Sequence, residues 1–235
     1  MLIHGTRFSG AQWAAYPSLL PEAEVAAPDL PGHGARVGEP FTADTALAVI
    51  DEAVRGAEPG QPVVLAGHSL GGYLSMLYAA THPGALAALA LVGATAEPGG
   101  RGSWTYRAFA AVLPHVGHDR MARAANRVMG WLGAPAEALP DGAGYAATPD
   151  AWRVVMEQCH PSLLDRVDCP VLLVNGQWDQ MRVHVRRFAS RCRDVRVVTV
   201  PRASHLLPLT HPEELAAALR QLLPGPGPSP RVGDD

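Results

Sequence analysis

One short turn constrains the fold of this chain more than any other feature of the sequence. Val63–Ala66 is an apolar run typical of a buried strand, and Leu70–Ala80 has the length and apolar content of a helix. The residues that join them read Gly67-His-Ser-Leu-Gly71, with a serine at the centre. Small residues on both sides let strand and helix approach closely, and the sharp turn strains the serine backbone. We therefore expect Ser69 to expose its hydroxyl beyond a strand end, at a helix N-terminus that stabilises negative charge.

The rest of the chain alternates short apolar runs with helical patterns, which is typical of parallel strands joined by crossover helices. The sequence predicts an α/β fold with a mostly parallel sheet of about six strands and helices on both faces. The expected strands are Met1–His4, Val25–Ala27, Val63–Ala66, Ala88–Val92, Val171–Val174 and Val195–Val200. The expected helices are Asp44–Ala57, Leu70–Ala80, Tyr106–Leu113, Arg120–Leu132, Ala151–Cys159 and a last one that a capping box at Thr210–Glu213 opens.

The length of the chain, 235 residues of which 48% are hydrophobic, suits one globular domain with a full core. The interval 95–168 interrupts the alternation of strands and helices, so we expect a helical lid there. The core is then made of 1–94 and 169–223. Residues 224–235 are rich in Pro and Gly, which predicts a disordered tail.

The composition excludes several classes of function. A net charge of −3 offers no surface for nucleic acid, and no apolar run is long enough to cross a membrane. The three cysteines lack metal-ligand spacing and the N-terminus lacks a signal-peptide pattern, so we expect a reduced, cytoplasmic protein. The sequence has neither a phosphate-binding loop nor a dinucleotide fingerprint. We therefore expect chemistry without a metal or a cofactor.

Four segments together resemble the α/β-hydrolase superfamily, and the resemblance covers nearly the whole chain up to Leu223. They are the turn around Ser69, Leu2–Thr6, which is similar to the oxyanion-loop strand end of that family, Pro28–Gly34, and the C-terminal pair Val171–Asp179 and Val197–His205. The last two lie where members of the family carry their acid and their histidine. The resemblance implies the α/β-hydrolase fold with a helical lid.

The order Ser69, Asp179, His205 is the order of a hydrolase catalytic triad. A serine hydroxyl is a poor nucleophile until an imidazole removes its proton, and His205 follows a predicted strand at the same sheet edge. Asp179 ends another strand and is expected to orient that imidazole. The competing acids precede their strands and so belong at the opposite edge; they are Asp165, Asp168 and Asp194.

The oxyanion hole is expected to use two backbone N–H groups. One is that of Leu70, which follows the nucleophile, and the resemblance points to Thr6 for the other. Three further histidines, His4, His33 and His68, are interpreted as parts of the loop architecture.

The favoured activity is hydrolysis of an ester, thioester or lactone of a small hydrophobic substrate through an acyl-serine intermediate. The same triad also serves carbon–carbon cleavage, elimination, lyase or acyl-transfer chemistry, and these stay open because one fold hosts many reactions. A different class of function is a ligand-binding protein in which the hydrolase fold has no catalytic activity.

The expected lid supplies candidates for substrate contact. Its large apolar side chains include Trp104, Tyr106, Phe109 and Trp131, which we expect to line an apolar pocket over Ser69. Its first half is also rich in arginine, which suits an anionic partner such as an acyl carrier or a coenzyme A thioester. Those arginines are Arg101, Arg107, Arg120, Arg123 and Arg127.

The N-terminus departs from the family pattern, because members usually have an antiparallel hairpin before the strand that leads to His4. Without those first strands, Val25–Ala27 is expected to lie at an open sheet edge. Such an edge invites pairing, so we expect either a homodimer or a natural chain that begins further upstream.

Overall fold

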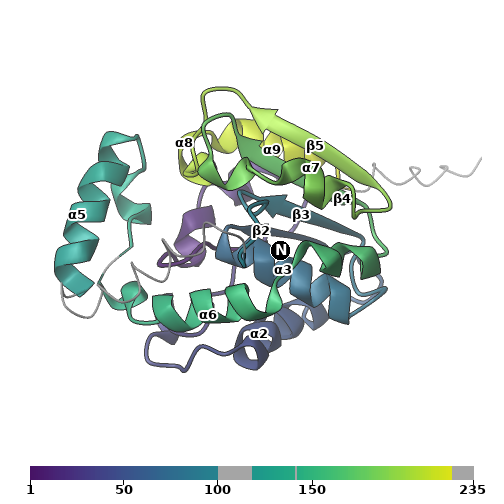
Figure 1. Cartoon of the computed structure of the whole chain (residues 1–235), viewed down its shortest axis with the longest axis horizontal. Helices are drawn as coiled ribbons and strands as arrows, with labels where there is room; N and C mark the ends of the chain where they lie inside the picture. Colours follow the sequence, from purple (N-terminus) through teal and green to yellow (C-terminus); the bar gives the residue numbers. More distant parts are fainter. Residues whose placement is uncertain (100–117, 141, 224–235) are drawn as a thin grey trace, which may run out of the picture.

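The computed structural model describes residues 1–99, 118–140 and 142–223. Its centre is a sheet in which all five strands are parallel and lie in chain order, β1-β2-β3-β4-β5 (Figure 1). The strands are β1 Leu2–Ile3, β2 Val64–His68, β3 Ala88–Val92, β4 Val171–Gly176 and β5 Val195–Val200. Because parallel strands share one direction, their carboxyl ends and the loops that follow them meet at one edge of the sheet.

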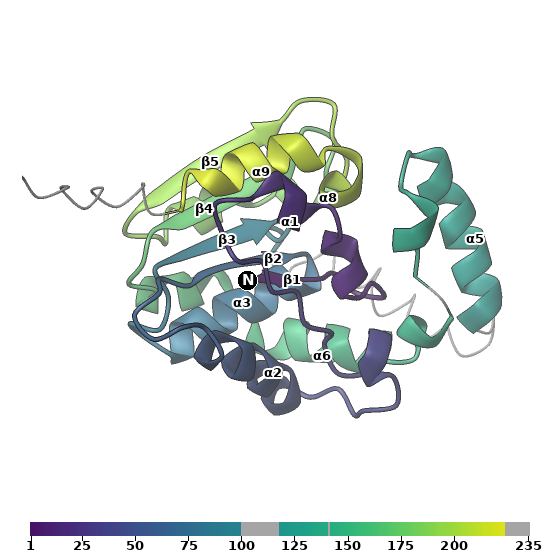
Figure 2. The same cartoon turned by 180° about the vertical axis from the view of Figure 1, so that it is seen from behind.

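Helices cover both faces of the sheet, as the two opposite views show (Figures 1 and 2). Side chains of β3 alternate between the two cores, so that Leu89 packs in one and Ala90 in the other. One core contains residues of α2, α3, α6 and α7, and the other those of α1, α8 and α9. The helices are α1 Tyr16–Leu19, α2 Ala43–Arg55, α3 Leu70–Thr81, α5 His118–Trp131, α6 Thr148–Gln158, α7 Val185–Ala189, α8 Leu207–Thr210 and α9 Pro212–Arg220.

The sheet has five strands in the described residues, whereas the sequence predicts about six. The missing one is Val25–Ala27, which has no regular strand structure. This segment lies beside β1, and the N–H of Leu2 donates to the carbonyl oxygen of Ala26 over 2.8 Å. A first strand of only two residues offers too few backbone groups to build a ladder there.

The prediction of a capping box at Thr210 is wrong. Thr210 belongs to the short helix α8, and its hydroxyl bonds the carbonyl oxygen of Leu206 over 3.2 Å. His211 is the N-cap residue of α9, and it makes no side-chain capping bond. Leu215 and Leu219 of α9 are buried against the sheet, so the expected apolar face is present although the helix begins two residues after Thr210.

The interval expected to form a lid packs in two different ways. Its later part joins the main core, because Ala151, Val154 and Val155 of α6 are buried against α3 and its neighbours. The helix α5 stands apart from the sheet in both views and forms a smaller cluster, in which Met129 packs with Phe8 (Figures 1 and 2). The expected helix Tyr106–Leu113 and the tail 224–235 lie outside the described residues. In the described part of the chain, no helix is both long and apolar enough to cross a membrane.

Candidate active site

The turn between β2 and α3 holds Ser69 in a strained conformation. Its φ of 51° and ψ of −114° lie where a non-glycine residue is uncommon. The turn is also tight, because a Cβ added to Gly67 would lie 2.2 Å from the carbonyl oxygen of Gly71. The backbone N–H of Ser69 donates to Val92 of the neighbouring strand over 2.8 Å. The sequence therefore folds into the expected sharp turn between strand and helix, which places Ser69 beyond the carboxyl end of β2.

A carboxylate and an imidazole meet beside this turn. Asp179 follows β4 and His205 follows β5, and Asp179 Oδ1 lies 3.0 Å from His205 Nδ1. The same carboxylate oxygen accepts the backbone N–H of Met181 over 2.7 Å. Burial acts to raise the pKa of the Asp179 carboxyl, but the hydrogen bond and charge of His205 and the Met181 N–H outweigh it and lower that pKa. Asp179 is therefore a carboxylate at neutral pH.

Gly93 contributes to this pair, and the sequence analysis did not identify it. It follows β3 with a φ of +57°, which disfavours a side chain. A Cβ added there would lie 2.9 Å from Asp179 Oδ2 and 3.0 Å from His205 Nδ1. Its position directly after a buried strand, like that of Ser69, was the available signal. Gly93 therefore leaves the space in which carboxylate and imidazole meet.

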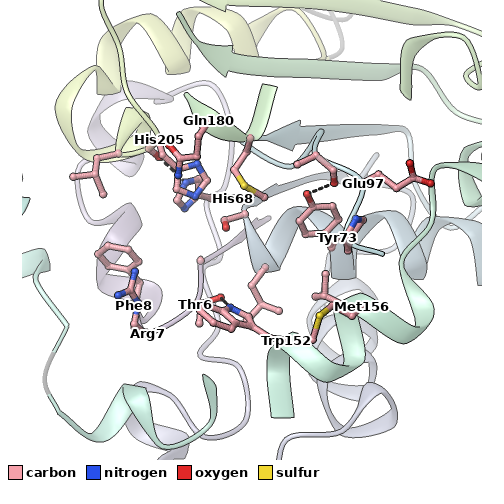
Figure 3. Close-up of a pocket in the computed structure, with 18 residues that line it drawn as sticks. Thr6, Arg7, Phe8, His68, Tyr73, Glu97, Trp152, Met156, Gln180 and His205 are labelled. Atoms are coloured by element: carbon pink, nitrogen blue, oxygen red, sulfur yellow. Dashed lines mark hydrogen bonds between the residues drawn. The ribbon is translucent and has the colours of Figure 1, made fainter. Parts of the chain in front are cut away.

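Ser69 and His205 line one cavity of about 170 Å³, and Asp179 contacts His205 without lining that cavity. Within the described residues, the Ser69 hydroxyl forms no hydrogen bond. The apolar part of the lining comes mainly from the first loop, α3 and α6 (Figure 3). The principal apolar lining residues are Phe8, Leu70, Tyr73, Trp152, Val155, Met156, Met181 and Leu206.

The two N–H groups expected to form an oxyanion hole belong to residues that line this cavity, Thr6 and Leu70. Neither N–H has a hydrogen-bond partner within the described part of the chain. The hydroxyl of Thr6 accepts a bond from the Trp152 indole over 3.3 Å, which ties α6 to the first loop. The backbone N–H of Leu70 is at the N-terminus of α3, where the helix dipole adds to its positive potential.

Of the four lid residues expected to contact substrate, the structure describes one. Trp131 is 85% exposed at the end of α5 and does not line the cavity, so that expectation is wrong. The inward face of α5 carries Ala122 and Met129, and Trp131, two residues after Met129, falls on the opposite face. Trp104, Tyr106 and Phe109 lie outside the described residues. Trp152 of α6, another large apolar side chain of the expected lid, does line the cavity.

Two charged side chains lie on opposite sides of the cavity (Figure 3). Glu97 forms an ion pair with Arg187. Arg7 stacks over the ring of Tyr145, 5.1 Å from its centroid, and donates to the phenol oxygen over 3.2 Å. Because both contacts of Arg7 are with an uncharged group, the first loop keeps a net positive charge on its side of the cavity.

Three buried histidines surround the site without being triad members. Burial lowers the pKa of both His4 and His68 to about 3, so both are neutral. Burial also lowers the pKa of His33, whose Nδ1 donates to the carbonyl oxygen of Pro31 over 2.9 Å. Each ring is held by hydrogen bonds within the loops, which agrees with the interpretation of these residues as loop architecture.

The competing acids lie away from the site. Asp168 lies three residues before the start of β4 and Asp194 directly precedes β5, so both are at the amino ends of their strands. Asp165 forms an exposed ion pair with Arg191 over 2.9 Å. Asp179 is therefore the carboxylate that the fold brings to His205. Among the described residues there is also no group of three or more His, Cys, Asp or Glu side chains that could hold a metal ion.

Known proteins resemble this chain both in sequence and in fold. A model described as the alpha/beta hydrolase family matches residues 1–218. A pimeloyl-(acyl-carrier protein) methyl ester esterase of Neisseria meningitidis serogroup A is 28% identical over 248 residues, which cover 95% of this chain and 76% of that protein. The esterase of the same name from Aromatoleum aromaticum is 27% identical over 254 residues, which cover 96% of this chain and 98% of that protein. Among solved structures, a thermophilic esterase from Thermogutta terrifontis superposes with a TM-score of 0.77 at 23% identity, covering 94% of this chain and 87% of that one.

Proposed function

The chain belongs to the alpha/beta hydrolase family, and from this premise we propose that it hydrolyses an ester, thioester or lactone with Ser69, His205 and Asp179 as its catalytic triad. The family and the esterases among its relatives make the chain a hydrolase. The observation that carries the assignment of the triad is the 3.0 Å contact between Asp179 and His205 beside a strained serine.

In the proposed first step, Ser69 Oγ attacks the carbonyl carbon of the substrate. His205 Nε2 takes the hydroxyl proton and later gives it to the leaving alcohol or thiol. Asp179 accepts a bond from His205 Nδ1, and this bond selects the tautomer whose Nε2 is free to act as a base. The bond between the Ser69 hydroxyl and His205 Nε2 is proposed to form in the substrate complex, where catalytic hydrogen bonds commonly tighten.

The negative charge that develops on the substrate oxygen is proposed to be stabilised by the N–H groups of Thr6 and Leu70. Both have no other partner within the described residues, so no competing bond has to break before they bind the oxyanion. The α3 N-terminus adds its positive potential at the same place. Water, activated by His205, then attacks the acyl-serine and releases the acid.

The lining of the cavity supports a hydrophobic acyl group as substrate. Tyr73 of α3 and Trp152, Val155 and Met156 of α6 form a largely apolar wall. Apolar contact along such a wall stabilises each additional buried methylene by about 0.8 kcal/mol. We therefore propose that a medium-length or aromatic acyl group binds better than acetyl.

The proposed partner is an anionic carrier of the acyl group. The curated relatives are named for esters on an acyl-carrier protein. On α5 of this chain Arg120, Arg123 and Arg127 are exposed, and their spacing of three and four residues places them on one helix face. Such a row of guanidinium groups suits a phosphate or an acidic protein surface. A coenzyme A thioester, which is also anionic, is the alternative.

A fluorophosphonate probe tests the proposed nucleophile. We expect it to label the folded protein, and we expect Ser69→Ala to abolish the labelling. If the folded wild-type protein is not labelled, the triad does not act and the ligand-binding alternative is favoured. Product analysis of methyl esters and thioesters of graded acyl length then distinguishes hydrolysis from acyl transfer or lyase chemistry.

A further inference from the structure

Three consecutive hydrogen bonds connect the first loop to the backbone of His205, and the mechanism above makes no use of them. The N–H of Gly5 donates to Gln12 Oε1 over 2.8 Å. Gln12 Nε2 lies 2.8 Å from His68 Nδ1, and His68 Nε2 lies 2.9 Å from the carbonyl oxygen of His205 (Figure 3 shows the last contact). Gln12 and His68 are 3% and 1% exposed. We call these three bonds the Gln12–His68 chain.

The direction of each bond in this chain follows from the chemistry of its ends. A backbone carbonyl only accepts, so His68 Nε2 must carry a proton and donate to His205. A neutral imidazole has one N–H, and His68 Nδ1 is therefore an acceptor. Gln12 must then turn its NH₂ group toward Nδ1, which leaves its carbonyl oxygen for the N–H of Gly5. One amide orientation and one tautomer satisfy all three bonds.

Protonation of His68 is incompatible with this arrangement. A second proton on Nδ1 would point at the NH₂ group of Gln12, so that two donors would face each other. If the Gln12 amide flipped to accept that proton, its NH₂ group would instead face the N–H of Gly5, which is also a donor. The groups around the ring are the titratable side chains of His4, His205 and Asp179. The chain therefore requires a neutral His68.

The peptide that carries the Thr6 N–H adjoins the Gly5 end of the Gln12–His68 chain, and it is fixed by a bond from His4. The N–H of Leu30 donates to His4 Nε2 over 2.9 Å, so His4 Nδ1 carries the proton and donates to the carbonyl oxygen of Gly5 over 2.9 Å. Gly5 is thus held at its N–H by Gln12 and at its carbonyl by His4. In a trans peptide the N–H points opposite to the carbonyl, so the hydrogen bond from His4 to the Gly5 carbonyl oxygen also sets the direction of the Thr6 N–H.

Close packing makes the arrangement specific. A Cβ at Gly5 would lie 2.7 Å from His68 Nδ1, in the space where the Gln12 amide reaches the ring. The rings of His68 and His205 pack with their centroids 4.8 Å apart. A displaced His68 would therefore disturb both the first loop and the residue proposed as the base.

We infer that Gln12 and His68 are positioning residues, which hold the Thr6 N–H and the His205 imidazole in a fixed relation on either side of Ser69. This inference rests on the proposed function. Gln12 does not line the cavity and His68, at its wall, is 1% exposed, so their effect passes through Gly5 and through the backbone of His205. Misplacement of a reacting or stabilising group by about 1 Å can cost about 100-fold in rate, so loss of the chain lowers the rate of the chemical step.

The experiment compares Gln12→Leu and Gln12→Glu with wild type on one ester. Gln12→Leu removes both bonds of the amide, and we expect kcat to fall about 10- to 100-fold while KM changes less than about threefold. Gln12→Glu keeps an acceptor for Gly5 but loses the donor to His68 Nδ1, and its carboxylate favours a doubly protonated ring. We expect ¹⁵N NMR of labelled histidine to show His68 as the neutral Nε2–H form in wild type and as the doubly protonated form in Gln12→Glu.

Tyr78→Phe is the control, because it removes a 3.1 Å bond to Asp51 on the far part of α3. We expect it to lower the melting temperature without changing kcat. Wild-type kcat in folded Gln12→Leu, or an Nδ1–H tautomer of His68 in wild type, would overturn the inference. If Ser69→Ala is fully active, the proposed function fails instead, and the NMR result still reports on the Gln12–His68 chain independently of activity.

Discussion

His205 Nδ1 lies 3.0 Å from Asp179 Oδ1, although the two residues are 26 positions apart and follow different strands. The contact forms because β4 and β5 are parallel neighbours, so the loops at their carboxyl ends lie side by side. Ser69 reaches the same edge after β2, through an elbow whose backbone bonds Val92 at the end of β3. The sheet thus brings together three side chains from three separate loops.

Ser69→Ala and His205→Ala should each reduce kcat by about three or more orders of magnitude, because nucleophile and base act as one unit. The double variant should be scarcely slower than either single variant. The measurement is kcat on a single ester, with circular dichroism to verify folding. Losses that multiply in the double variant would show that His205 is not the partner of Ser69.

Gly93→Ala should lower both kcat and the melting temperature, since the new methyl group would press on the Asp179–His205 pair at 2.9 and 3.0 Å. The matched control is Gly84→Ala, which has a similar positive φ of +75° but nothing within 4 Å of the added Cβ. Both variants strain the backbone, so the difference between them isolates the contact with the pair. Equal kcat in the two variants would contradict the role given to Gly93.

The folded protein should lose stability as the pH falls from 7.5 to 5. The pKa values of His4 and His68 are lowered to about 3 on folding, so between pH 6.5 and 3 the unfolded chain binds these protons and the folded chain does not. Each histidine then lowers the free energy of unfolding by up to about 1.4 kcal/mol per pH unit below pH 6.5. Urea unfolding at several pH values measures this slope, and a constant free energy of unfolding over the range would contradict it.

A medium-length acyl ester should have a higher kcat/KM than the acetyl ester, because the wall formed by Trp152, Val155 and Met156 is apolar. We expect Trp152→Ala to reduce this preference, since it removes the largest side chain of that wall. The comparison uses esters with the same leaving alcohol. A wild-type protein that prefers acetyl esters would refute the proposed hydrophobic substrate.

Replacing Arg120, Arg123 and Arg127 together with Ser should raise KM for a carrier-linked ester about tenfold or more, and leave KM for a small neutral ester unchanged. Added salt should weaken the carrier-linked reaction in wild type and have little further effect in the variant. The control replaces exposed Arg193 and Arg196, near and on β5, in the same way. Equal responses of the two substrates would remove the case for an anionic carrier.

The sequence by itself determined the parts of this site that depend on local pattern. An apolar run, a turn with Ser69 and an apolar helix identified the elbow, and the positions of Asp179 and His205 in the segments that follow predicted strands placed them at the same edge. Parallel strands joined by helices make this inference possible, because position relative to a strand end decides which edge a residue occupies. Element boundaries were less well determined, as the last helix begins at Pro212 rather than at Thr210.

Tertiary structure alone decided the contacts between loops that are distant in sequence. His68 bonds Gln12 across 56 positions and His205 across 137, and no periodicity or motif in the sequence predicts either of these bonds. The fit of Gly93 beneath the Asp179–His205 pair and the outward direction of Trp131 likewise depend on how loops and α5 pack. Local patterns fix which edge or face a residue occupies, whereas the partner it meets there is chosen by close packing of the whole core.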